Sequence, residues 1–212
     1  MTEIKIDNSL VRRRDLPVII PNVSRDDLPA FFKKLGFKVG AEVGVYKGQF
    51  MELFCREGFK MYGIEPYRTY EDYDVKEKNF QAVQEAILQE ATQRLSKYPN
   101  YTLIRKTSMD AVKDFEDESL DFVYIDGHHG FKYIAEDLWE WSKKVKKGGV
   151  ICGHDYFALR KDWRGPYCSH VKEVVDAFTL ALDINPWFVL GERFKKEGEK
   201  RDPYRSWMWI NK

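Results

Sequence analysis

Short apolar runs alternate with amphipathic stretches along most of the chain. The runs have the length and apolar content of strands, and the stretches between them repeat apolar residues at helical spacing. This alternation is typical of βαβ units, so we predict an α/β fold with a parallel sheet covered by helices. The predicted strands are residues 39–43, 61–64, 101–104, 120–125 and 149–152. The predicted helices are residues 25–35, 49–57, 72–97, 131–145 and 171–182.

The pattern changes near the C-terminus. Two strand-like runs, 187–190 and 206–210, are joined by a charged loop that has no room for a crossover helix. We therefore predict that they pair antiparallel as a hairpin, which makes the sheet mixed. No repeat or low-complexity linker divides the chain, so we predict a single domain over residues 1–212, with an N-terminal arm at 1–23 and the sheet-and-helix core at 38–212.

Composition and charge exclude several classes of function. The chain has 212 residues, 43% of them hydrophobic, and its 35 Lys and Arg nearly balance 34 Asp and Glu. A formal charge of +1 favours neither nucleic acid nor an anionic membrane as a partner. The apolar runs are shorter than the roughly 20 residues of a membrane helix, and the first residues lack the apolar core of a secretory signal, so we expect a cytoplasmic protein. Cys55, Cys152 and Cys168 lack CxxC spacing and predict neither a disulfide framework nor a zinc site.

The turn after the first strand has the glycines of a ligand-binding loop. Gly44 and Gly48 allow a tight turn at the carboxyl edge of the sheet, where ligands bind, although such glycines also serve helix packing alone. Glu65 ends the second strand about 20 residues after Gly44, the separation at which an acidic residue accepts ribose hydroxyls. Tyr46 stands where a glycine would admit a pyrophosphate. We therefore predict a site for a nucleoside without phosphates.

Two interpretations are open for the segment after the third strand. Ser108 and Met109 lie within residues 107–110, where they would line an adenine pocket. A hydroxyl residue that opens a short helix is more often only an N-cap.

Histidines and acidic residues gather after the fourth and fifth strands. Asp126, His128 and His129 follow the fourth strand, and His154 and Asp155 follow the fifth. Three of the four histidines of the chain are in this set. Turn formation explains Asp126 but not the paired imidazoles, so we predict an active site at this edge.

Five segments together resemble a known enzyme family. They are AEVGVYKGQF, YGIEPY, SLDFVYIDGHHGFKYIAEDLWEW, KKGGVICGHDY and HVKEVVDAF. They are similar to class I S-adenosylmethionine-dependent methyltransferases, in particular the small-molecule O-methyltransferase branch with Gly-His-Asp-Tyr after strand five. The resemblance covers residues 39–212. It implies a Rossmann-like fold with a seven-stranded, mostly parallel sheet, an antiparallel last strand and helices on both faces.

The resemblance also implies roles for individual residues in binding S-adenosylmethionine. Glu42 and Gly44 would approach the methionine part, Glu65 would hold the ribose, and Ser108 and Met109 would border the adenine. The cofactor-binding set that we predict is Glu42, Gly44, Tyr46, Gly48, Glu65, Ser108, Met109 and Asp126.

Related enzymes often hold a divalent metal between acidic residues that follow strands four and five. Asp126 and Asp155 match that pattern, whereas His154 stands where a carboxylate is expected. An imidazole suits Mg²⁺ less than Mn²⁺ or iron, so a divalent cation such as Mg²⁺ or Mn²⁺ is a candidate second cofactor and a metal-free site is the alternative. We take His129 as the base that deprotonates the acceptor, with His128 and His154 assisting or orienting, although the pattern of relatives leaves His128 open as the base.

The expected reaction is methyl transfer to the hydroxyl of a small molecule. The basic and aromatic residues after strand five suit a planar or acidic acceptor such as a sugar, a phenol or a phosphorylated metabolite. Acceptor contacts are predicted in residues 67–73 and 156–169, and the basic arm residues 12–14 are left without a role. A homodimer is an open alternative to a monomer. Two other functions are open, namely a noncatalytic nucleoside-binding protein and a NAD-dependent dehydrogenase. The sequence lacks the GxGxxG motif that a dehydrogenase would need.

Overall fold

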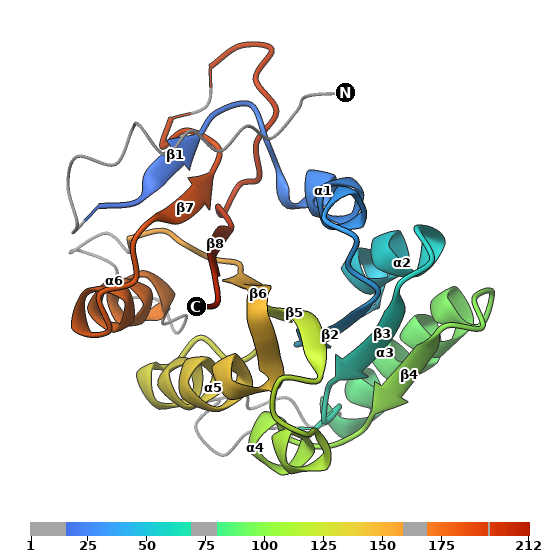
Figure 1. The fold of residues 1–212 in the computed structure, drawn as a ribbon. Coiled ribbons are helices and arrows are strands. Elements are labelled where there is room, and N and C mark those ends of the chain that lie inside the picture. Colours follow the sequence, from blue (N-terminus) through green and yellow to red (C-terminus); the bar gives the residue numbers. More distant parts are fainter. Residues whose placement is uncertain (1–15, 69–79, 159–168, 195) are drawn as a thin grey trace.

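The sheet of this protein is continuous and mixed (Figure 1). The computed structural model describes residues 16–68, 80–158, 169–194 and 196–212. Eight strands lie in the order β1-β7-β8-β6-β5-β2-β3-β4, and β8 alone runs antiparallel to its neighbours, β6 and β7. The strands are β1 (Val18–Ile20), β2 (Val39–Val43), β3 (Lys60–Ile64), β4 (Tyr101–Ile104), β5 (Leu120–Ile125), β6 (Val145–Gly153), β7 (Trp187–Leu190) and β8 (Trp207–Ile210). The predicted Rossmann-like α/β fold and its terminal hairpin are confirmed.

Helices cover both faces of the sheet (Figure 1). One face carries α1 (Leu28–Lys34), α2 (Gln49–Arg56) and α3 (Phe80–Leu95), and the other carries α4 (Ser108–Ala111), α5 (Phe131–Lys144) and α6 (Val171–Ala181). Two short 3-10 helices, η2 (Arg25–Asp27) and η3 (Val112–Asp114), accompany α1 and α4.

The central strand β5 shows how the sequence produces these layers. Phe122 and Tyr124 pack with the aromatic residues of α1 and α2, whereas Val123 and Ile125 pack with the apolar residues of α5. Successive side chains of a strand point to opposite faces, so a strand that is buried on both sides is apolar throughout. β5 is therefore an interior strand with a hydrophobic core on each side.

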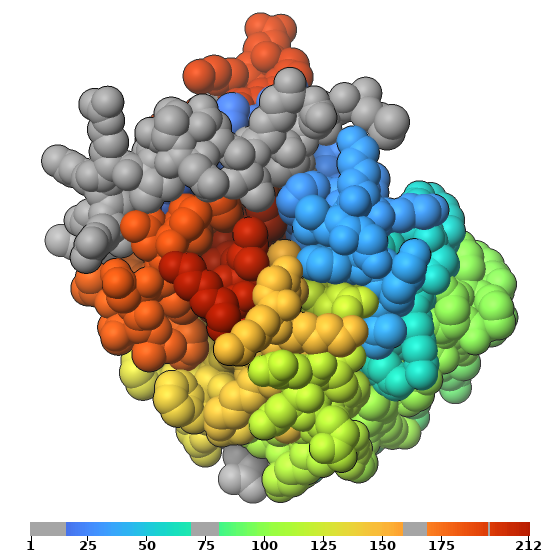
Figure 2. Space-filling view, viewed as in Figure 1, coloured from blue at the N-terminus to red at the C-terminus, as the bar shows by residue number. Residues whose placement is uncertain are grey.

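The segment expected to be an arm contributes an eighth strand. Val18, Ile19 and Ile20 form β1, which pairs in parallel with β7. Ile20 is buried in one core and Ile19 packs against the other, so the strand extends both layers. The N-terminal segment (blue) consequently lies beside the C-terminal segment (red) in Figure 2.

Other differences from the expected elements are small. The helix predicted over 25–35 begins with one 3-10 turn, and of the helix predicted over 72–97 the structure describes α3, while residues 72–79 lie outside the described residues. Cys55 and Cys152 are buried free thiols, and Cys168 lies outside the described residues. In the part of the chain that the structure describes, no helix is both long and apolar enough to cross a membrane.

Candidate active site

A cavity of about 560 Å³ opens at the carboxyl ends of β2, β3 and β5. This volume is in the range of small-molecule and cofactor sites. Seven of the predicted site residues line it, namely Gly44, Tyr46, Glu65, Ser108, Met109, Asp126 and His128. The edge of the sheet chosen from the sequence is therefore the edge that carries the cavity.

Gly44 brings the turn after β2 against the end of β5. Its φ is +93°, and a Cβ atom there would lie 2.0 Å from the backbone oxygen of Asp126. Glycine accepts both the positive φ and the close approach because it has no side chain. The turn and Asp126 can therefore form one wall of the cavity.

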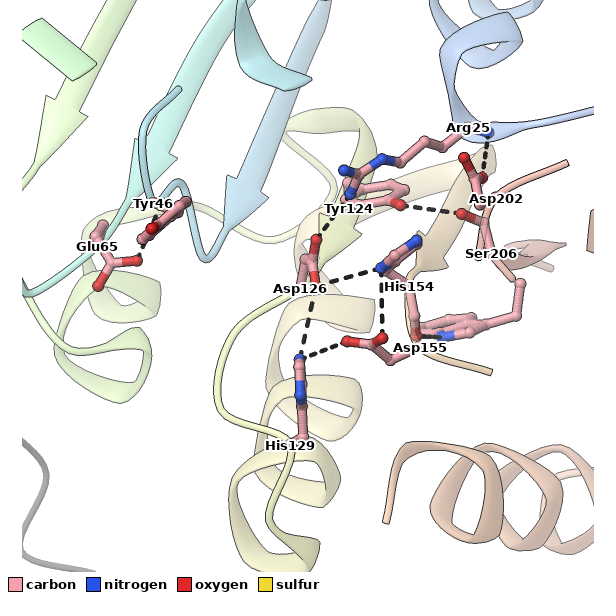
Figure 3. Close-up of polar contacts among 11 residues, drawn as sticks. Arg25, Tyr46, Glu65, Tyr124, Asp126, His129, His154, Asp155, Asp202 and Ser206 are labelled. Atoms are coloured by element: carbon pink, nitrogen blue, oxygen red, sulfur yellow. Dashed lines mark hydrogen bonds and ion pairs between the residues drawn. The ribbon is translucent and has the colours of Figure 1, made fainter. Parts of the chain in front are cut away.

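Glu65 presents a half-buried carboxylate to the same cavity (Figure 3). Its Oε2 accepts a hydrogen bond of 3.3 Å from the backbone N–H of Tyr46, and its Oε1 accepts one of 3.4 Å from that of Tyr67. Burial raises the pKa of Glu65, and these backbone donors oppose the shift. The carboxylate is oriented by the backbone and keeps acceptor capacity for a ligand hydroxyl.

Ser108 is engaged with buried residues of α5. Its hydroxyl donates to the Asp137 carboxylate and accepts a hydrogen bond of 2.7 Å from Nε1 of Trp141. Thr107, and not Ser108, is the N-cap of α4, because its side chain accepts from the backbone N–H of Asp110. Asp137 is 3% exposed, and burial raises its pKa to about 7. A carboxyl group that titrates near neutral pH thus lines the cavity.

Glu42 and Gly48 lie behind the cavity lining. Glu42 is 2% exposed, and its Oε2 has no hydrogen-bond partner among the described residues. Burial raises its pKa well above the usual range, and the nearby carboxylates of Asp126 and Glu65 add to the shift. Gly48 begins α2, and a Cβ there would meet Leu95 at 3.2 Å, so its absent side chain allows close helix packing.

Asp126, His129, His154 and Asp155 form an acid–histidine group beside the cavity (Figure 3). The register of the sheet creates this group, because Ile125 of β5 pairs with Gly153 of β6 and the next residue of each strand extends past the same edge. Nε2 of His129 lies 2.9 Å from Oδ2 of Asp155 and 3.6 Å from Oδ1 of Asp126. The predicted convergence of these side chains is observed.

The group is strongly coupled electrostatically. Burial would lower the pKa of His129, but the nearby carboxylates of Asp126 and Asp155 raise it to about 9. Burial likewise opposes ionisation of Asp155, but the imidazole of His129 lowers the pKa of that carboxyl. Asp155 also has a φ of +58°, which is uncommon for a residue other than glycine. This backbone conformation occurs at the point where the Asp155 side chain meets His129.

His154, Asp126 and Asp155 can each offer one ligand atom to a metal ion. These ligand atoms lie within 4.8 Å of one another. Nδ1 of His154 is 3.8 Å from Oδ1 of Asp126 and 3.6 Å from Oδ1 of Asp155. Nitrogen and oxygen donors at this spacing fit a divalent transition-metal ion such as Mn²⁺ better than Mg²⁺, which prefers oxygen.

His128 faces the cavity and not the acid–histidine group. It lines the cavity, and its ring centroid lies 4.0 Å from that of Tyr133. Its Nδ1 accepts a hydrogen bond of 3.0 Å from the backbone N–H of Gly130. The structure therefore places the two adjacent histidines in different surroundings.

Comparison with known families identifies the family of the domain that carries this site. Residues 41–156 match the model of a family described as a methyltransferase domain, and this span includes both the cavity turn and the acid–histidine group. The chain belongs to this methyltransferase family. This match favours a methyltransferase over the dehydrogenase alternative. The methyltransferase also matches the uncharacterized protein y4gI of Sinorhizobium fredii with 36% identity over 53 residues, which are 25% of the chain and 6% of that relative.

Solved structures with similar folds act on different kinds of acceptor. An O-methyltransferase from Bacillus cereus in complex with SAH has a TM-score of 0.58 and 14% identity, with 88% of the methyltransferase and 80% of that chain covered. An rRNA methylase from Streptococcus thermophilus has a TM-score of 0.59, 14% identity and coverage of 87% and 93%. The N-methyltransferase NodS from Bradyrhizobium japonicum has a TM-score of 0.56, 13% identity and coverage of 88% and 94%. The fold is shared, and the acceptor must be argued from the site.

Two residues that the structure brings to this edge were not predicted from the sequence. Asp137 shares the buried face of α5 with Leu138 and Trp141, and a carboxylate at that position of an amphipathic helix is a signal that the sequence contains. Arg25 contacts Asp126 from the N-terminal part of the chain, and no local pattern predicts that contact.

Part of the predicted acceptor region of the methyltransferase lies outside the described residues. This applies to residues 69–73 and 159–168, and to the basic residues 12–14 of the arm.

Proposed function

We propose that this methyltransferase transfers a methyl group to the hydroxyl oxygen of a small-molecule acceptor. The observation that carries the proposal is the acid–histidine group, because it places an imidazole between two carboxylates beside the cofactor-sized cavity. Oxygen nucleophiles must lose a proton during the transfer, and a histidine between carboxylates can accept it. When bound, S-adenosylmethionine supplies an electrophilic methyl carbon on a positively charged sulfur.

The described residues fit this cofactor. Glu65 would accept hydrogen bonds from the ribose hydroxyls, since its carboxylate is held in the cavity by backbone donors. Glu42 has a buried oxygen with no partner in the part of the chain that the structure describes, and an ammonium group nearby would satisfy it and stabilise its charged form. Met109, His128 and Asp137 line the part of the cavity where the adenine would lie. These roles account for a buried and a half-buried carboxylate near one cavity.

His129 is the proposed base. The neutral form of His129, which prevails above its raised pKa of about 9, would take the proton of the acceptor hydroxyl. The acceptor oxygen would bond to the methyl carbon while the sulfur leaves with the electrons of the C–S bond, giving S-adenosylhomocysteine, the methylated acceptor and a protonated His129. Asp126 and Asp155 stabilise the imidazolium that results, since both lie within reach of Nε2. His128 and His154 would orient the cofactor and the acceptor.

Asp126, His154 and Asp155 would hold a divalent cation if one takes part in the reaction. Such an ion would lower the pKa of the acceptor hydroxyl and orient it toward the methyl carbon. The donor set favours Mn²⁺ over Mg²⁺ for the reasons given above. We further predict that the acceptor is a small molecule, that the protein is located in the cytoplasm, and that it is either a homodimer or a monomer.

Calorimetric titration with S-adenosylhomocysteine tests the cofactor site. We expect saturable binding by the wild type and an unchanged affinity in Glu116→Gln. Glu65→Gln should lower the affinity by roughly tenfold or more, because the loss of a hydrogen bond to a charged group has about this effect on binding. Glu116 is exposed and remote from the cavity, so it is the matched control. Equal affinities of wild type and Glu65→Gln would remove Glu65 from the site.

Turnover with a panel of sugars, phenols and catechols tests the chemistry. We expect His129→Ala to lower kcat by at least about a hundredfold, the usual contribution of a general base, while the affinity for S-adenosylhomocysteine stays near the wild-type value. Turnover that survives His129→Ala but not His128→Ala would move the base to His128. A wild type that binds cofactor and methylates no acceptor oxygen would favour the noncatalytic alternative.

A further inference from the structure

A second cavity, of about 550 Å³, lies on the other side of the acid–histidine group. Its lining includes residues 156–158 after β6, residues 192–194 after β7, and Arg201, Pro203 and Arg205 before β8. Leu16, Pro17 and Ile19 of the N-terminal segment also line it. Since β8 is antiparallel, its beginning lies at the same edge of the sheet as the ends of β6 and β7. The second cavity therefore shares the edge of the sheet that carries the cofactor cavity.

Short connections join the second cavity to the acid–histidine group. Tyr156, which lines the cavity, directly follows Asp155. Asp202, between two lining residues, accepts a hydrogen bond of 2.8 Å from the backbone N–H of Arg25, and the Arg25 side chain contacts Asp126. Figure 3 shows Asp202 on the side of the group opposite to Glu65. An acceptor hydroxyl near His129 would thus leave the rest of the molecule within reach of the second cavity.

The charged residues that line the second cavity are predominantly basic. Lys172, Arg193, Arg201 and Arg205 line it, and Glu192 is the one acidic residue among the lining residues that the structure describes. Two of these cations are already engaged, since Lys172 pairs with Asp176 and Arg201 donates to backbone oxygens, including that of Arg193 at 2.6 Å. The side chains of Arg193 and Arg205 are therefore the cations that decide whether the cavity can bind an anion.

Arg193 and Arg205 form no ion pair within the described parts of the chain. Arg205 is half-buried, and its backbone oxygen accepts a hydrogen bond of 2.9 Å from the N–H of Tyr156. Burial lowers the pKa of Arg205, and the charges of Arg201 and Arg193 lower it further. Among the described lining residues, positive charge thus exceeds the single negative charge of Glu192, which is the electrostatic condition for binding an anion.

Aromatic rings lie beside these cations. The ring of Tyr156 lies under two of them, with Nζ of Lys172 at 5.1 Å and Cζ of Arg205 at 5.4 Å from its centroid. The ring of Phe157, which lines the cavity, lies 4.6 Å from that of Tyr204. Arginine beside flat apolar surface suits an organic molecule that carries an oxyanion, because guanidinium donates two parallel hydrogen bonds to carboxylate or phosphate.

We propose that the second cavity binds an anionic group, a carboxylate or a phosphate, of the methyl acceptor, with Arg205 and Arg193 as its specificity-determining residues. This proposal rests on the proposed function, since it names the class of acceptor that the same active site takes. The acceptor is then a small hydroxylated anion whose hydroxyl lies at the acid–histidine group while its charge lies in the second cavity.

Binding of matched probes to the protein saturated with S-adenosylhomocysteine tests the proposal. The probes are 4-hydroxybenzoate, 4-hydroxyphenyl phosphate and the neutral 4-hydroxybenzamide, and the variants are Arg205→Gln, Arg193→Gln and the control Arg56→Gln. Arg56 is an exposed arginine of α2 away from both cavities. Thermal unfolding and cofactor affinity of each variant verify that the fold is retained, and Arg205→Lys tests partial rescue by a single positive charge.

We expect at least one anionic probe to bind wild type about tenfold or more tighter than the neutral probe, as charge-assisted hydrogen bonds require. Arg205→Gln should remove most of this preference, Arg193→Gln part of it and Arg56→Gln none. Comparison of the two anions identifies the carboxylate or the phosphate as the preferred group. Equal affinity for charged and neutral probes, no binding of either anion, or an unchanged preference in Arg205→Gln overturns the proposal. Failure of wild type to bind S-adenosylhomocysteine would instead overturn the cofactor site itself.

Discussion

Nη1 of Arg25 lies 3.1 Å from Oδ2 of Asp126, although the two residues are 101 positions apart in the chain. Arg25 belongs to η2 in the N-terminal part of the chain, whereas Asp126 follows the central strand β5. The guanidinium also lies over the ring of Phe50, with 5.1 Å between Cζ and the ring centroid. The N-terminal segment thus holds one carboxylate of the active site in place.

This contact predicts the effect of Arg25→Gln on stability. The pair is partly buried, with 31% and 19% of the two side chains exposed, so we expect the free energy of unfolding to fall by about 1–3 kcal/mol rather than by the larger cost of breaking a fully buried pair. Urea denaturation measures the change. Arg25→Lys keeps the charge and should lose less, and an exposed-site control, Arg56→Gln, should stay within about 0.5 kcal/mol of wild type.

Gly44→Ala and Gly36→Ala separate backbone strain from close contact. Both glycines have positive φ, +93° and +81°, but a Cβ at Gly44 would lie 2.0 Å from the Asp126 backbone oxygen, whereas a Cβ at Gly36 would meet nothing within 4 Å. Gly36→Ala should cost only the roughly 1–2 kcal/mol of left-handed strain and leave cofactor affinity unchanged. Gly44→Ala should cost more and weaken S-adenosylhomocysteine binding. If both variants lose similar amounts of stability and of affinity for S-adenosylhomocysteine, the close approach of the turn to β5 has no role in binding.

Asp137 predicts a pH dependence of stability. Its pKa is raised to about 7 in the folded protein by burial, against about 3.9 in an unfolded chain. Between these two pKa values the folded state keeps a proton that the unfolded state has lost. The contribution of Asp137 to the free energy of unfolding is therefore largest below about pH 4 and falls by up to roughly 4 kcal/mol as the pH rises to about 7.

The difference between wild type and Asp137→Asn isolates that contribution. Asparagine is uncharged at every pH, so we expect the variant to be more stable than wild type at pH 8 and to lose this advantage as the pH falls toward 4. Denaturant unfolding at a series of pH values gives the comparison. Asp114→Asn, at an exposed position, should follow the wild-type curve. A wild-type minus Asp137→Asn difference that is constant with pH would show that Asp137 ionises normally.

The proposed metal ligands predict which variants lose divalent-cation binding. Mn²⁺ should bind the wild type saturated with S-adenosylhomocysteine more tightly than Mg²⁺ does, because one of the three donors is an imidazole. Asp155→Asn should weaken Mn²⁺ binding by about tenfold or more, and Asp114→Asn should not change it. Electron paramagnetic resonance of free Mn²⁺ measures Mn²⁺ binding by both variants. If chelation leaves turnover unchanged and Mn²⁺ does not bind, the acid–histidine group acts through its side chains alone.

Much of this active site was predictable from the sequence because each residue there sits in a local pattern. Apolar runs mark the strands, and ligand residues in a parallel sheet follow strand ends, so Glu65, Asp126 and Asp155 could be assigned to one edge before any coordinates were known. Gly44 was predictable for the same reason. The terminal hairpin followed from the length of the loop between its strands, which excludes a crossover helix.

Other features depended on contacts between distant parts of the chain. Val18 to Ile20 contain too few residues to show a strand period, and they become a strand only because β7 offers a free edge. The contact of Arg25 with Asp126 and the position of Arg205 beside Tyr156 follow from how helices and loops pack on the sheet. The sequence by itself determined the order of the elements and the edge that carries the chemistry, since both follow from local periodicity. Tertiary structure alone decided which distant charges meet there, because burial and pairing depend on the whole packed chain.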